Sequence, residues 1–298
     1  MKTWKKDKSI LTKRTGAEKV FFGATFVFFA LYAASLTLPF VWLFLKSLEE
    51  PGGYLLNRSL YGAFWITDTF HFKNYITALT EMQDKGVNFL GMIVNSIWYV
   101  GIGTVQTIFW HAITAYVISK YTFRGKKFLY NLVIICAIVP LMGTSAATYK
   151  LISALNLYDT GPLYLIITSF GGLGGSFLMM VGMFSGISWS YAEAVFIDGG
   201  SDNTVFFKIM LPQVMPALAA LAINTAIGLW NNYMQPLMYM PSTPMVASGL
   251  YRVSLYIHRL GEPIYFSGLI LSMLPVLILY AFIAENMMTN LSIGGLKG

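Results

Sequence analysis

The uncharged apolar run from Val20 to Leu45 limits what this chain can fold into more than any other feature. As a helix its 26 residues would be about 39 Å long, whereas the hydrocarbon core of a bilayer is about 30 Å thick. The apolar region of a secretory signal peptide is shorter, only about 7 to 15 residues. We therefore expect a retained transmembrane helix, with a kink at Pro39.

Five further apolar runs have the length of a membrane span. They are Phe89 to Ile118, Phe128 to Tyr149, Pro162 to Ile187, Val214 to Tyr233 and Ile264 to Met287. Charged residues make up only 11% of the chain, where a soluble domain carries about 25%. The sequence therefore excludes an ordinary soluble fold and predicts an all-α, polytopic membrane protein with about six transmembrane helices.

The placement of Lys and Arg predicts the orientation of these spans. With the N-terminus inside, 13 basic residues fall on the cytoplasmic side and 7 on the other, and cytoplasmic loops carry such an excess. Both termini are thus expected in the cytoplasm. The expected segments are a basic cytoplasmic tail at 1–19, a first transmembrane helix at 20–45, an extracytoplasmic segment at 46–88, a core at 89–287 with five transmembrane helices and a cytoplasmic loop at 188–213, and a cytoplasmic tail at 288–298. Because the net charge of +7 is spread between apolar runs, it does not indicate a nucleic-acid partner.

The sequence carries no motif for chemistry of its own. A phosphate-binding loop needs a glycine five residues before its Gly-Lys pair, and Lys120 stands in that place before Gly125 and Lys126. Cys136 is the only cysteine and the three histidines are far apart, so no disulfide or metal cluster is expected. We expect a chain that binds no cofactor and is not an enzyme.

The stretch from Ser190 to Pro216, SYAEAVFIDGGSDNTVFFKIMLPQVMP, is the most informative part of the sequence. It predicts a short helix at Tyr191 to Ile197, a sharp turn at Gly199 that needs positive φ, and a second amphipathic segment at Asn203 to Leu211. Asp198 is expected to hold the turn through hydrogen bonds to following N–H groups. An amphipathic loop that merely rests on lipid headgroups is the alternative interpretation.

This stretch resembles the cytoplasmic coupling loop of ATP-binding-cassette importer permeases. The pattern of that family is Glu-Ala-Ala, two residues, Asp-Gly-Ala, and then an apolar stretch ending in Ile and Pro. The matching positions are Glu193, Ala194, Asp198, Gly199, Phe206, Ile209, Pro212 and Pro216. Val195 and Gly200 depart from it, since the family usually has alanine at both positions.

The resemblance extends to the carbohydrate-uptake branch, which contains the maltose-type inner-membrane permeases, and covers nearly the whole chain from about residue 20. Its further marks are Asn95-Ser96, Phe123-Arg124-Gly125-Lys126, Pro140, Trp230-Asn231-Asn232 and the terminal Gly294-Gly295-Leu296-Lys297-Gly298.

The resemblance implies a division of labour among several chains in the bacterial cytoplasmic (inner) membrane. Such a transporter has a second permease subunit, here a different chain, two ATPase subunits that bind the ATP, and an extracytoplasmic solute-binding protein that delivers a sugar or oligosaccharide. The short cytoplasmic helix would dock on an ATPase subunit. The residues implied in this docking are Glu193, Ala194, Val195, Phe196, Ile197, Asp198, Gly199 and Gly200.

Polar residues inside the apolar spans indicate where a sugar could pass, because they are costly in lipid unless they face a cavity or a partner. The candidates for this path are Asn95, Asn224, Trp230 and Asn231. Hydrogen bonding between helices, or anchoring at the membrane interface, is the alternative explanation for the same residues.

An ion-coupled secondary transporter of small polar solutes is the competing class. Such transporters use acidic residues within the membrane and usually contain an internal repeat. The predicted spans contain almost no acidic residues away from their ends, and the sequence shows no clear duplication. A dependence of uptake on ATP separates the two classes.

Overall fold

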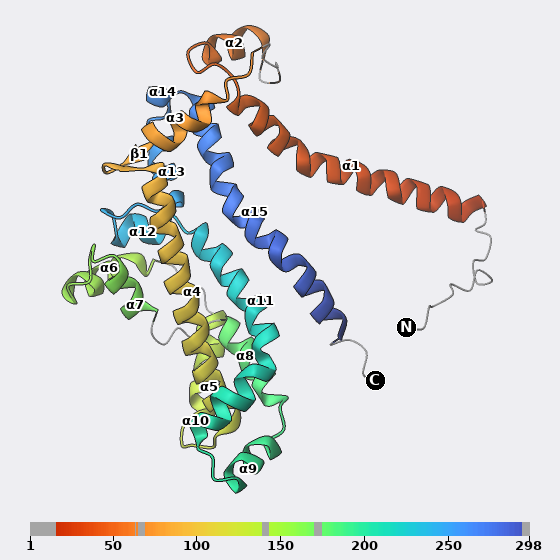
Figure 1. Ribbon diagram of the computed structural model, residues 1–298, viewed down its shortest axis with the longest axis vertical. Coiled ribbons are helices and arrows are strands. Elements are labelled where there is room, and N and C mark those ends of the chain that lie inside the picture. Colours follow the sequence, from red (N-terminus) through yellow and green to blue (C-terminus); the bar gives the residue numbers. More distant parts are fainter. Residues whose placement is uncertain (1–15, 63, 65–68, 139–142, 170–174, 294–298) are drawn as a thin grey trace.

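Long apolar helices form the frame of the molecule (Figure 1). The computed structural model describes residues 16–62, 64, 69–138, 143–169 and 175–293. The helices long and apolar enough to cross a membrane are α1 (Gly16–Ser47), α4 (Phe89–Lys120), the continuous run Asp202–Trp230, which ends in α11 (Leu211–Trp230), and α15 (Glu262–Ile293). Such helices satisfy their backbone hydrogen bonds internally, as a lipid environment demands. The structure thus confirms an all-α fold with several membrane-spanning helices.

The other two predicted spans, 128–149 and 162–187, are each divided between two shorter helices. These are α5 (Lys126–Ile138), α6 (Ser145–Ala154), α7 (Pro162–Thr168) and α8 (Gly175–Ser185). In the sequence, Pro140 lies between α5 and α6, and most of the glycine-rich run 171–175 lies between α7 and α8. Proline and glycine disfavour a continuous helix. Pro140 and residues 171–174 lie outside the described residues. The tails at 1–15 and 294–298 also lie outside them, so the count of six spans and the cytoplasmic termini remain predictions.

Helix α4 is the centre of the bundle and packs along α8 and α11. Its buried Tyr116 joins Phe184 of α8 and Phe206, which precedes α11, in the largest of the described apolar clusters. Gly103 lets α11 come close, because a β-carbon at this position would lie 2.8 Å from Leu229 Cδ1. The α4–α11 contact is therefore closely fitted where the middle of α4 meets the C-terminal end of α11.

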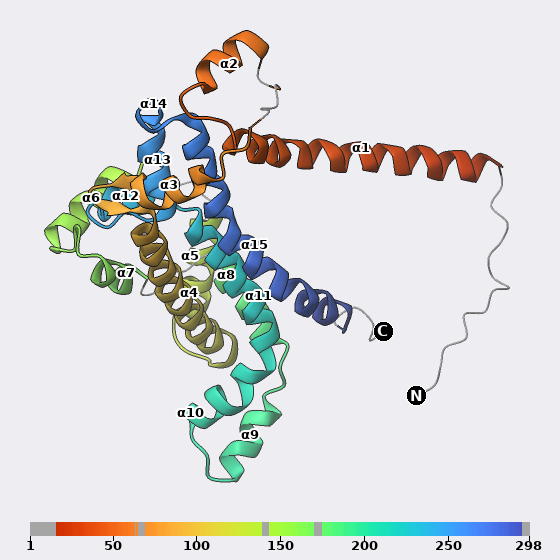
Figure 2. The ribbon, with the colours of Figure 1, turned by 45° about the horizontal axis from the view of Figure 1, so that its top comes forward.

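Short elements form a head at one end of the bundle (Figure 2). They are α2 (Tyr54–Tyr61), α3 (Lys73–Glu81), β1 (Gln83–Asp84), β2 (Val87–Asn88), α12 (Met234–Tyr239), α13 (Val246–Ser254) and α14 (Ile257–Leu260). The strands β1 and β2 pair as an antiparallel hairpin whose turn residues, Lys85 and Gly86, have φ of 52° and 78°, as a type I′ turn requires. Helices α3 and α13 both pack against α15 and α4. The segment 46–88 thus covers one end of the bundle, and its extracytoplasmic location remains a prediction.

A buried polar cluster ties the C-terminal end of α1 to the head. The Lys46 ammonium and the Glu49 carboxylate form an ion pair in which both side chains are almost fully buried. Asn74 Nδ2 donates to the carbonyl oxygens of Ser47 and Glu49, both at 2.8 Å, and Ser267 Oγ of α15 donates to the Ser47 carbonyl at 3.2 Å. A buried charge pair is tolerated only when the surrounding hydrogen-bonding groups are satisfied. This cluster therefore fixes the point at which α1 leaves the bundle.

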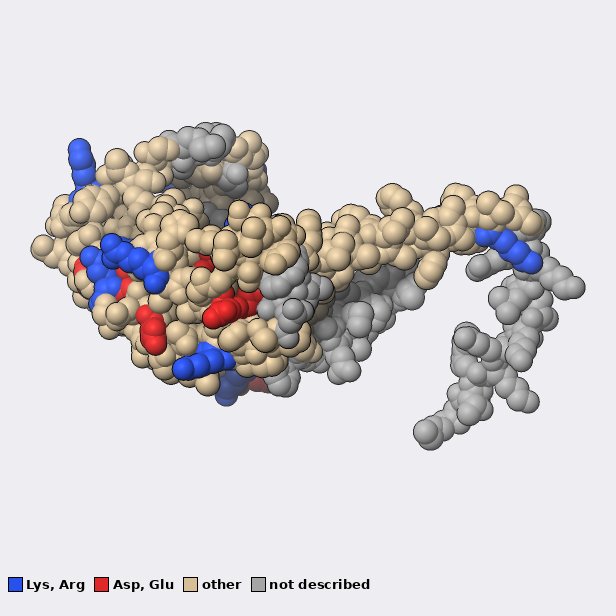
Figure 3. Space-filling model, turned by 90° about the horizontal axis from the view of Figure 1, so that it is seen from above, with Lys and Arg blue, Asp and Glu red and all other residues tan. Residues whose placement is uncertain are grey.

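From Gly16 to Val41, helix α1 is not buried against any part of the chain that the structure describes. Between Gly16 and Val41 every residue except Thr25 is exposed, although nearly all of them are apolar. Seen from above, charged residues gather on the head, whereas the arm formed by α1 shows basic side chains only at its far end (Figure 3). An apolar helix exposed on all sides requires lipid or another protein around it.

The two ends of the molecule should differ in their access from outside the cell. Ser59 lies in α2 of the head, and Ser201 directly precedes α10 (Asp202–Thr204) at the opposite end of the molecule (Figure 1). Both residues are exposed. In a variant lacking Cys136, a membrane-impermeant thiol reagent should modify Ser59→Cys in intact cells and spare Ser201→Cys. Both variants should react equally once the membrane is permeabilised. Modification of Ser201→Cys in intact cells would contradict the predicted orientation.

Candidate functional site

The end of the molecule opposite the head carries a short exposed helix. This helix is α9 (Ser190–Ile197), and it is followed by α10 (Asp202–Thr204) and a π-helical turn, η2 (Val205–Met210) (Figures 1 and 2). Within α9 only Ala192 is buried. The eight residues implied in docking lie together here, with Glu193, Ala194, Phe196, Ile197, Asp198 and Gly199 exposed and with Val195 and Gly200 half-buried.

A glycine turn ends α9. Gly199 has a φ of 76°, which confirms the expected turn, and a β-carbon in this left-handed region costs about 1 to 2 kcal/mol. The Gly199 N–H donates to the Phe196 carbonyl at 3.1 Å, and the Gly200 N–H donates to the Val195 carbonyl at 2.8 Å. These two bonds are a Schellman motif, which satisfies the last free carbonyls of a helix. The Asp198 carboxylate accepts no hydrogen bond from any described residue, so the backbone closes this turn in place of the side chain that the sequence suggested.

Val195 and Gly200 fit together across the turn. A β-carbon on Gly200 would overlap Val195 Cγ1 and would lie 3.0 Å from the Val195 carbonyl oxygen. Position 200 therefore favours glycine as long as position 195 is valine. The two positions that depart from the pattern of the resembling family are thus in direct contact across the turn.

Aromatic side chains tie α9 to the end of α4. Neighbouring ring centroids lie 6.2 Å apart for Phe196 and Trp189, 5.7 Å for Trp189 and Tyr121, and 5.6 Å for Tyr121 and Tyr116. The Tyr121 hydroxyl also donates to Asp202 Oδ1 of α10 at 2.5 Å. Burial, together with that hydrogen bond, raises the pKa of Tyr121, so its hydroxyl stays protonated and remains the donor. Each packed aromatic pair adds about 0.5 to 1.5 kcal/mol beyond its buried area, so the loop and the end of α4 are held as one body.

The loop passes into the membrane part of the chain without a break. The elements α10, η2 and α11 form one continuous helix of 29 residues from Asp202 to Trp230. The Leu211 N–H reaches back five residues to the Phe206 carbonyl, the hydrogen bond of a π-helix, just before Pro212, which has no N–H to donate. Single π-helical turns of this kind are frequent at functional sites. A displacement of the loop is therefore carried directly into α11.

Two of the four candidate solute-path residues lie apart from the others. Asn95 Nδ2 donates to the Pro244 carbonyl at 3.0 Å, and Asn95 Oδ1 accepts from Trp98 Nε1 at 3.3 Å, so this side chain joins α4 to the segment before α13. Asn224 is exposed on α11 and makes no hydrogen bond with the part of the chain that the structure describes. For Asn95 the contacts favour a role in helix packing.

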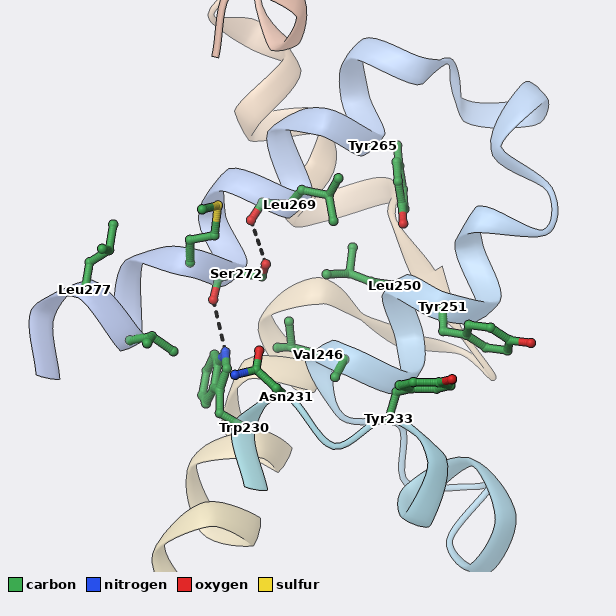
Figure 4. Close-up of a pocket in the computed structure, with 13 residues that line it drawn as sticks. Trp230, Asn231, Tyr233, Val246, Leu250, Tyr251, Tyr265, Leu269, Ser272 and Leu277 are labelled. Carbon is green, nitrogen blue, oxygen red and sulfur yellow. Dashed lines mark hydrogen bonds between the residues drawn. The ribbon is translucent and has the colours of Figure 1, made fainter. Parts of the chain in front are cut away.

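The other two, Trp230 and Asn231, meet at a cavity of about 510 Å³ where α11 ends (Figure 4). Trp230 Nε1 donates to the Ser272 carbonyl of α15 at 3.0 Å, which fixes the indole between two helices. Three tyrosines that sequence reasoning missed also line this cavity: Tyr233, Tyr251 and Tyr265. Tyr233 lies directly before α12, Tyr251 in α13 and Tyr265 in α15, so no local pattern in the sequence could have grouped them.

Known proteins similar to this chain are membrane transport subunits. A family model described as binding-protein-dependent transport system inner membrane component matches residues 108–290. The arabinooligosaccharides transport system permease protein AraQ of Halalkalibacterium halodurans is 27% identical over 205 residues, which are 68% of this chain and 73% of that protein. The diacetylchitobiose uptake system permease protein NgcG of Streptomyces coelicolor is 23% identical over 267 residues, which are 89% of this chain and 85% of that protein.

A solved structure shares the fold. It is that of a bacterial ABC transporter involved in the import of the acidic polysaccharide alginate, and one of its chains superposes with a TM-score of 0.75 at 19% identity, covering 92% of this chain and 99% of that chain. The family model covers more than half of the residues, from the middle of α4 to near the end of α15. The chain therefore belongs to the family of binding-protein-dependent transport system inner membrane components, the permeases of ABC transporters.

Proposed function

We propose that this chain is one of two different permease subunits of an ATP-driven importer that carries a sugar or oligosaccharide across the bacterial cytoplasmic membrane. Two separate ATPase subunits bind and hydrolyse the ATP, and an extracytoplasmic binding protein delivers the solute. Membership of the family supports the importer class. The names of the two relatives, which refer to arabinooligosaccharides and diacetylchitobiose, support a carbohydrate as the solute.

The exposed surface of α9 is the observation that carries this proposal. Ile197 is 86% exposed, and Tyr191 and Phe196 are 52% and 39% exposed, at the end of the molecule opposite the head. A few apolar side chains grouped on a small surface are typical of the residues that dominate the energy of a protein interface. Glu193 is exposed among them and can pair with a basic group at the rim. We assign this surface to the contact with an ATPase subunit.

A lipid surface fits α9 less well than a protein does. Helices that rest on a bilayer carry Lys and Arg on their polar face, and the headgroups of the cytoplasmic leaflet are negatively charged. Residues 190–200 contain Glu193 and Asp198 but no basic residue. Repulsion between like charges therefore disfavours the interpretation of this stretch as a loop that rests on lipid.

The packing around α9 supports a mechanical role for it. The aromatic contacts of Trp189 and the Tyr121–Asp202 hydrogen bond join the loop to the end of α4, and the same loop begins the helix that becomes α11. When the ATPase subunits close on ATP, a movement of α9 would shift the ends of both helices together. This shift is the step that we propose to open the permease outward.

An ion-coupled transporter would need acidic residues within the membrane to bind its coupling ion. No Asp or Glu occurs in residues 89–120, 211–230 or 263–284, which make up most of α4, α11 and α15. These stretches of the three helices therefore offer no carboxylate to a proton or sodium ion, and the two acidic residues of α15, Glu262 and Glu285, lie outside them. ATP is the better supported energy source.

A charge at Ile197 should weaken ATPase binding and leave the membrane part intact. Because the Ile197 side chain is 86% exposed in the permease, Ile197→Glu should not disturb the fold. In the proposed contact with the ATPase subunit this side chain becomes buried, so its loss should weaken the association about 30-fold, or about 2 kcal/mol. The amount of ATPase subunit that co-purifies with the permease, titrated in detergent, measures this effect. Leu255→Glu is the matched control, since Leu255 is an apolar residue of the head with 71% exposure, and it should bind normally. Full ATPase recovery with Ile197→Glu would contradict the docking surface.

The fit between Val195 and Gly200 provides an independent test of the turn. Gly200→Ala should introduce strain of about 1 to 3 kcal/mol and lower the solute-stimulated ATPase activity, because its β-carbon overlaps Val195 Cγ1. Val195→Ala removes the overlap with Cγ1 and leaves only the 3.0 Å approach to the carbonyl oxygen of residue 195, so the double variant should recover part of the lost activity, and Val195→Ala alone should lose little. ATPase rates of the wild type and the three variants form a double-mutant cycle. Strictly additive losses would show that the two positions do not fit together as described.

A further inference from the structure

We infer that the cavity at the end of α11 is a subsite for one uncharged sugar ring of the transported solute. This subsite rests on the proposed function and adds the chemical class of solute that it accepts. We name it the aromatic cavity. The lining residues that define it are Trp230, Asn231, Tyr233, Tyr251, Tyr265 and Ser272.

Three helices preform the aromatic cavity (Figure 4). Trp230 belongs to α11, Tyr251 to α13, and Tyr265 and Ser272 to α15. Its volume of about 510 Å³ lies within the range of small-molecule sites, roughly 300 to 1,000 Å³. Trp230 Nε1 donates to the Ser272 carbonyl at 3.0 Å, and Ser272 Oγ donates to the Leu269 carbonyl at 2.6 Å. One wall is thus already fixed, so little freedom is lost when a ligand binds against it.

A stacked pair of tyrosines forms the other side of the cavity. The ring centroids of Tyr233 and Tyr251 lie 4.9 Å apart, with 26° between the ring planes, and the two residues are 39% and 42% exposed. Figure 4 shows the two rings lying together, away from Trp230. A sugar ring has faces of C–H groups and an edge of hydroxyl groups, so it needs flat apolar surfaces next to hydrogen-bonding groups. Tyrosine and tryptophan supply both on stiff side chains.

Asn231 adds a polar group between the aromatic walls. Its Nδ2 donates to the Ile227 carbonyl at 2.9 Å, which holds the amide at the end of α11. The amide oxygen makes no hydrogen bond with described residues and is an acceptor for a sugar hydroxyl. The cavity therefore combines a few polar groups with a mainly apolar lining.

The charge of the lining decides which sugars fit. None of the described residues that line the cavity is Lys, Arg, Asp or Glu. Arg252, which follows Tyr251 in sequence, lies with its Nε 3.5 Å from Asp84 Oδ2 and is engaged there. A carboxylate that entered the cavity would lose hydration without gaining a charged partner. The aromatic cavity should therefore select a neutral ring over a uronate.

The position of the cavity also fits a step in transport. Trp230 is the last residue of the continuous helix that begins at Asp202, close to α9. A movement of α9 is therefore transmitted to a wall of the aromatic cavity. Binding and release of the sugar ring can follow the ATPase cycle in this way.

Uptake by the complete transporter in sealed vesicles, with ATP on the cytoplasmic side, tests the subsite. The probes are neutral trisaccharides of glucose, galactose and arabinose, and a galacturonate trisaccharide. For the neutral probe that is taken up, Tyr251→Ala should raise KM about tenfold, whereas Tyr251→Phe, which keeps the ring, should raise it less than about threefold. Tyr280→Ala is the matched control and should leave KM unchanged, because Tyr280 is 61% exposed on α15 and does not line the cavity.

The outcomes separate the subsite from the proposed function. ATP-driven uptake with an unchanged KM in Tyr251→Ala would overturn the subsite and leave the proposed function standing. Uptake that needs no ATP would overturn the proposed function itself. Uptake of the galacturonate probe alone would overturn the selection of a neutral ring.

Photolabelling covers the case in which Tyr251→Ala assembles poorly. A diazirine derivative of the transported neutral trisaccharide should label peptides from residues 230–251 or 265–277 of the wild-type chain. An excess of the unlabelled neutral trisaccharide should prevent this labelling, and the galacturonate trisaccharide should not. Labelling of other segments, or labelling that no sugar prevents, as expected for a cavity occupied by lipid, would overturn the assignment.

Discussion

The absence of water from the hydrocarbon core of a membrane is the constraint on which the rest of this structure depends. Every backbone polar group there must be bonded within its own helix, which is why the chain consists of long apolar helices with few charges. The same environment removes the hydrophobic drive to pack apolar helices against one another. Helix α1 is accordingly exposed over most of its length. At its C-terminal end it is anchored by the buried Lys46–Glu49 pair and the hydrogen bonds of Asn74, and by the contact of the Trp42 ring with Phe266 of α15.

The proposed functional sites lie where regular helices stop or change. The Schellman turn at Gly199 ends α9, a π-helical turn interrupts the regular pattern before α11, and the aromatic cavity opens where α11 ends at Trp230. The continuous helix from Asp202 to Trp230 has 29 residues and is about 43 Å long at 1.5 Å per residue. One stiff element therefore connects the proposed ATPase contact with the proposed sugar subsite. Rigid elements of this kind are suited to carry a displacement between distant sites.

The sequence predicted the local features, such as a short helix and its terminal turn, that a few adjacent residues determine. The short helix expected at 191–197 is found as α9, and the turn at Gly199 follows, because a helix end is set by local backbone chemistry. Contacts between distant residues could not be predicted in this way. Asn95 bonds to Pro244, 149 residues away, and the stacked rings of Tyr233 and Tyr251 come from different elements. The contact between Gly200 and Val195 could not be predicted either, because the sequence showed only that these two positions depart from the family pattern.

ATP hydrolysis on partner chains is the central element of the function proposed for this permease. The most direct test is uptake of a transported trisaccharide into sealed vesicles that contain the complete transporter, measured with and without ATP on the cytoplasmic side and with ionophores that collapse the proton and sodium gradients. We predict that uptake requires ATP and continues when both gradients are collapsed. Uptake that proceeds without ATP and stops when the gradients are collapsed would contradict the proposed coupling.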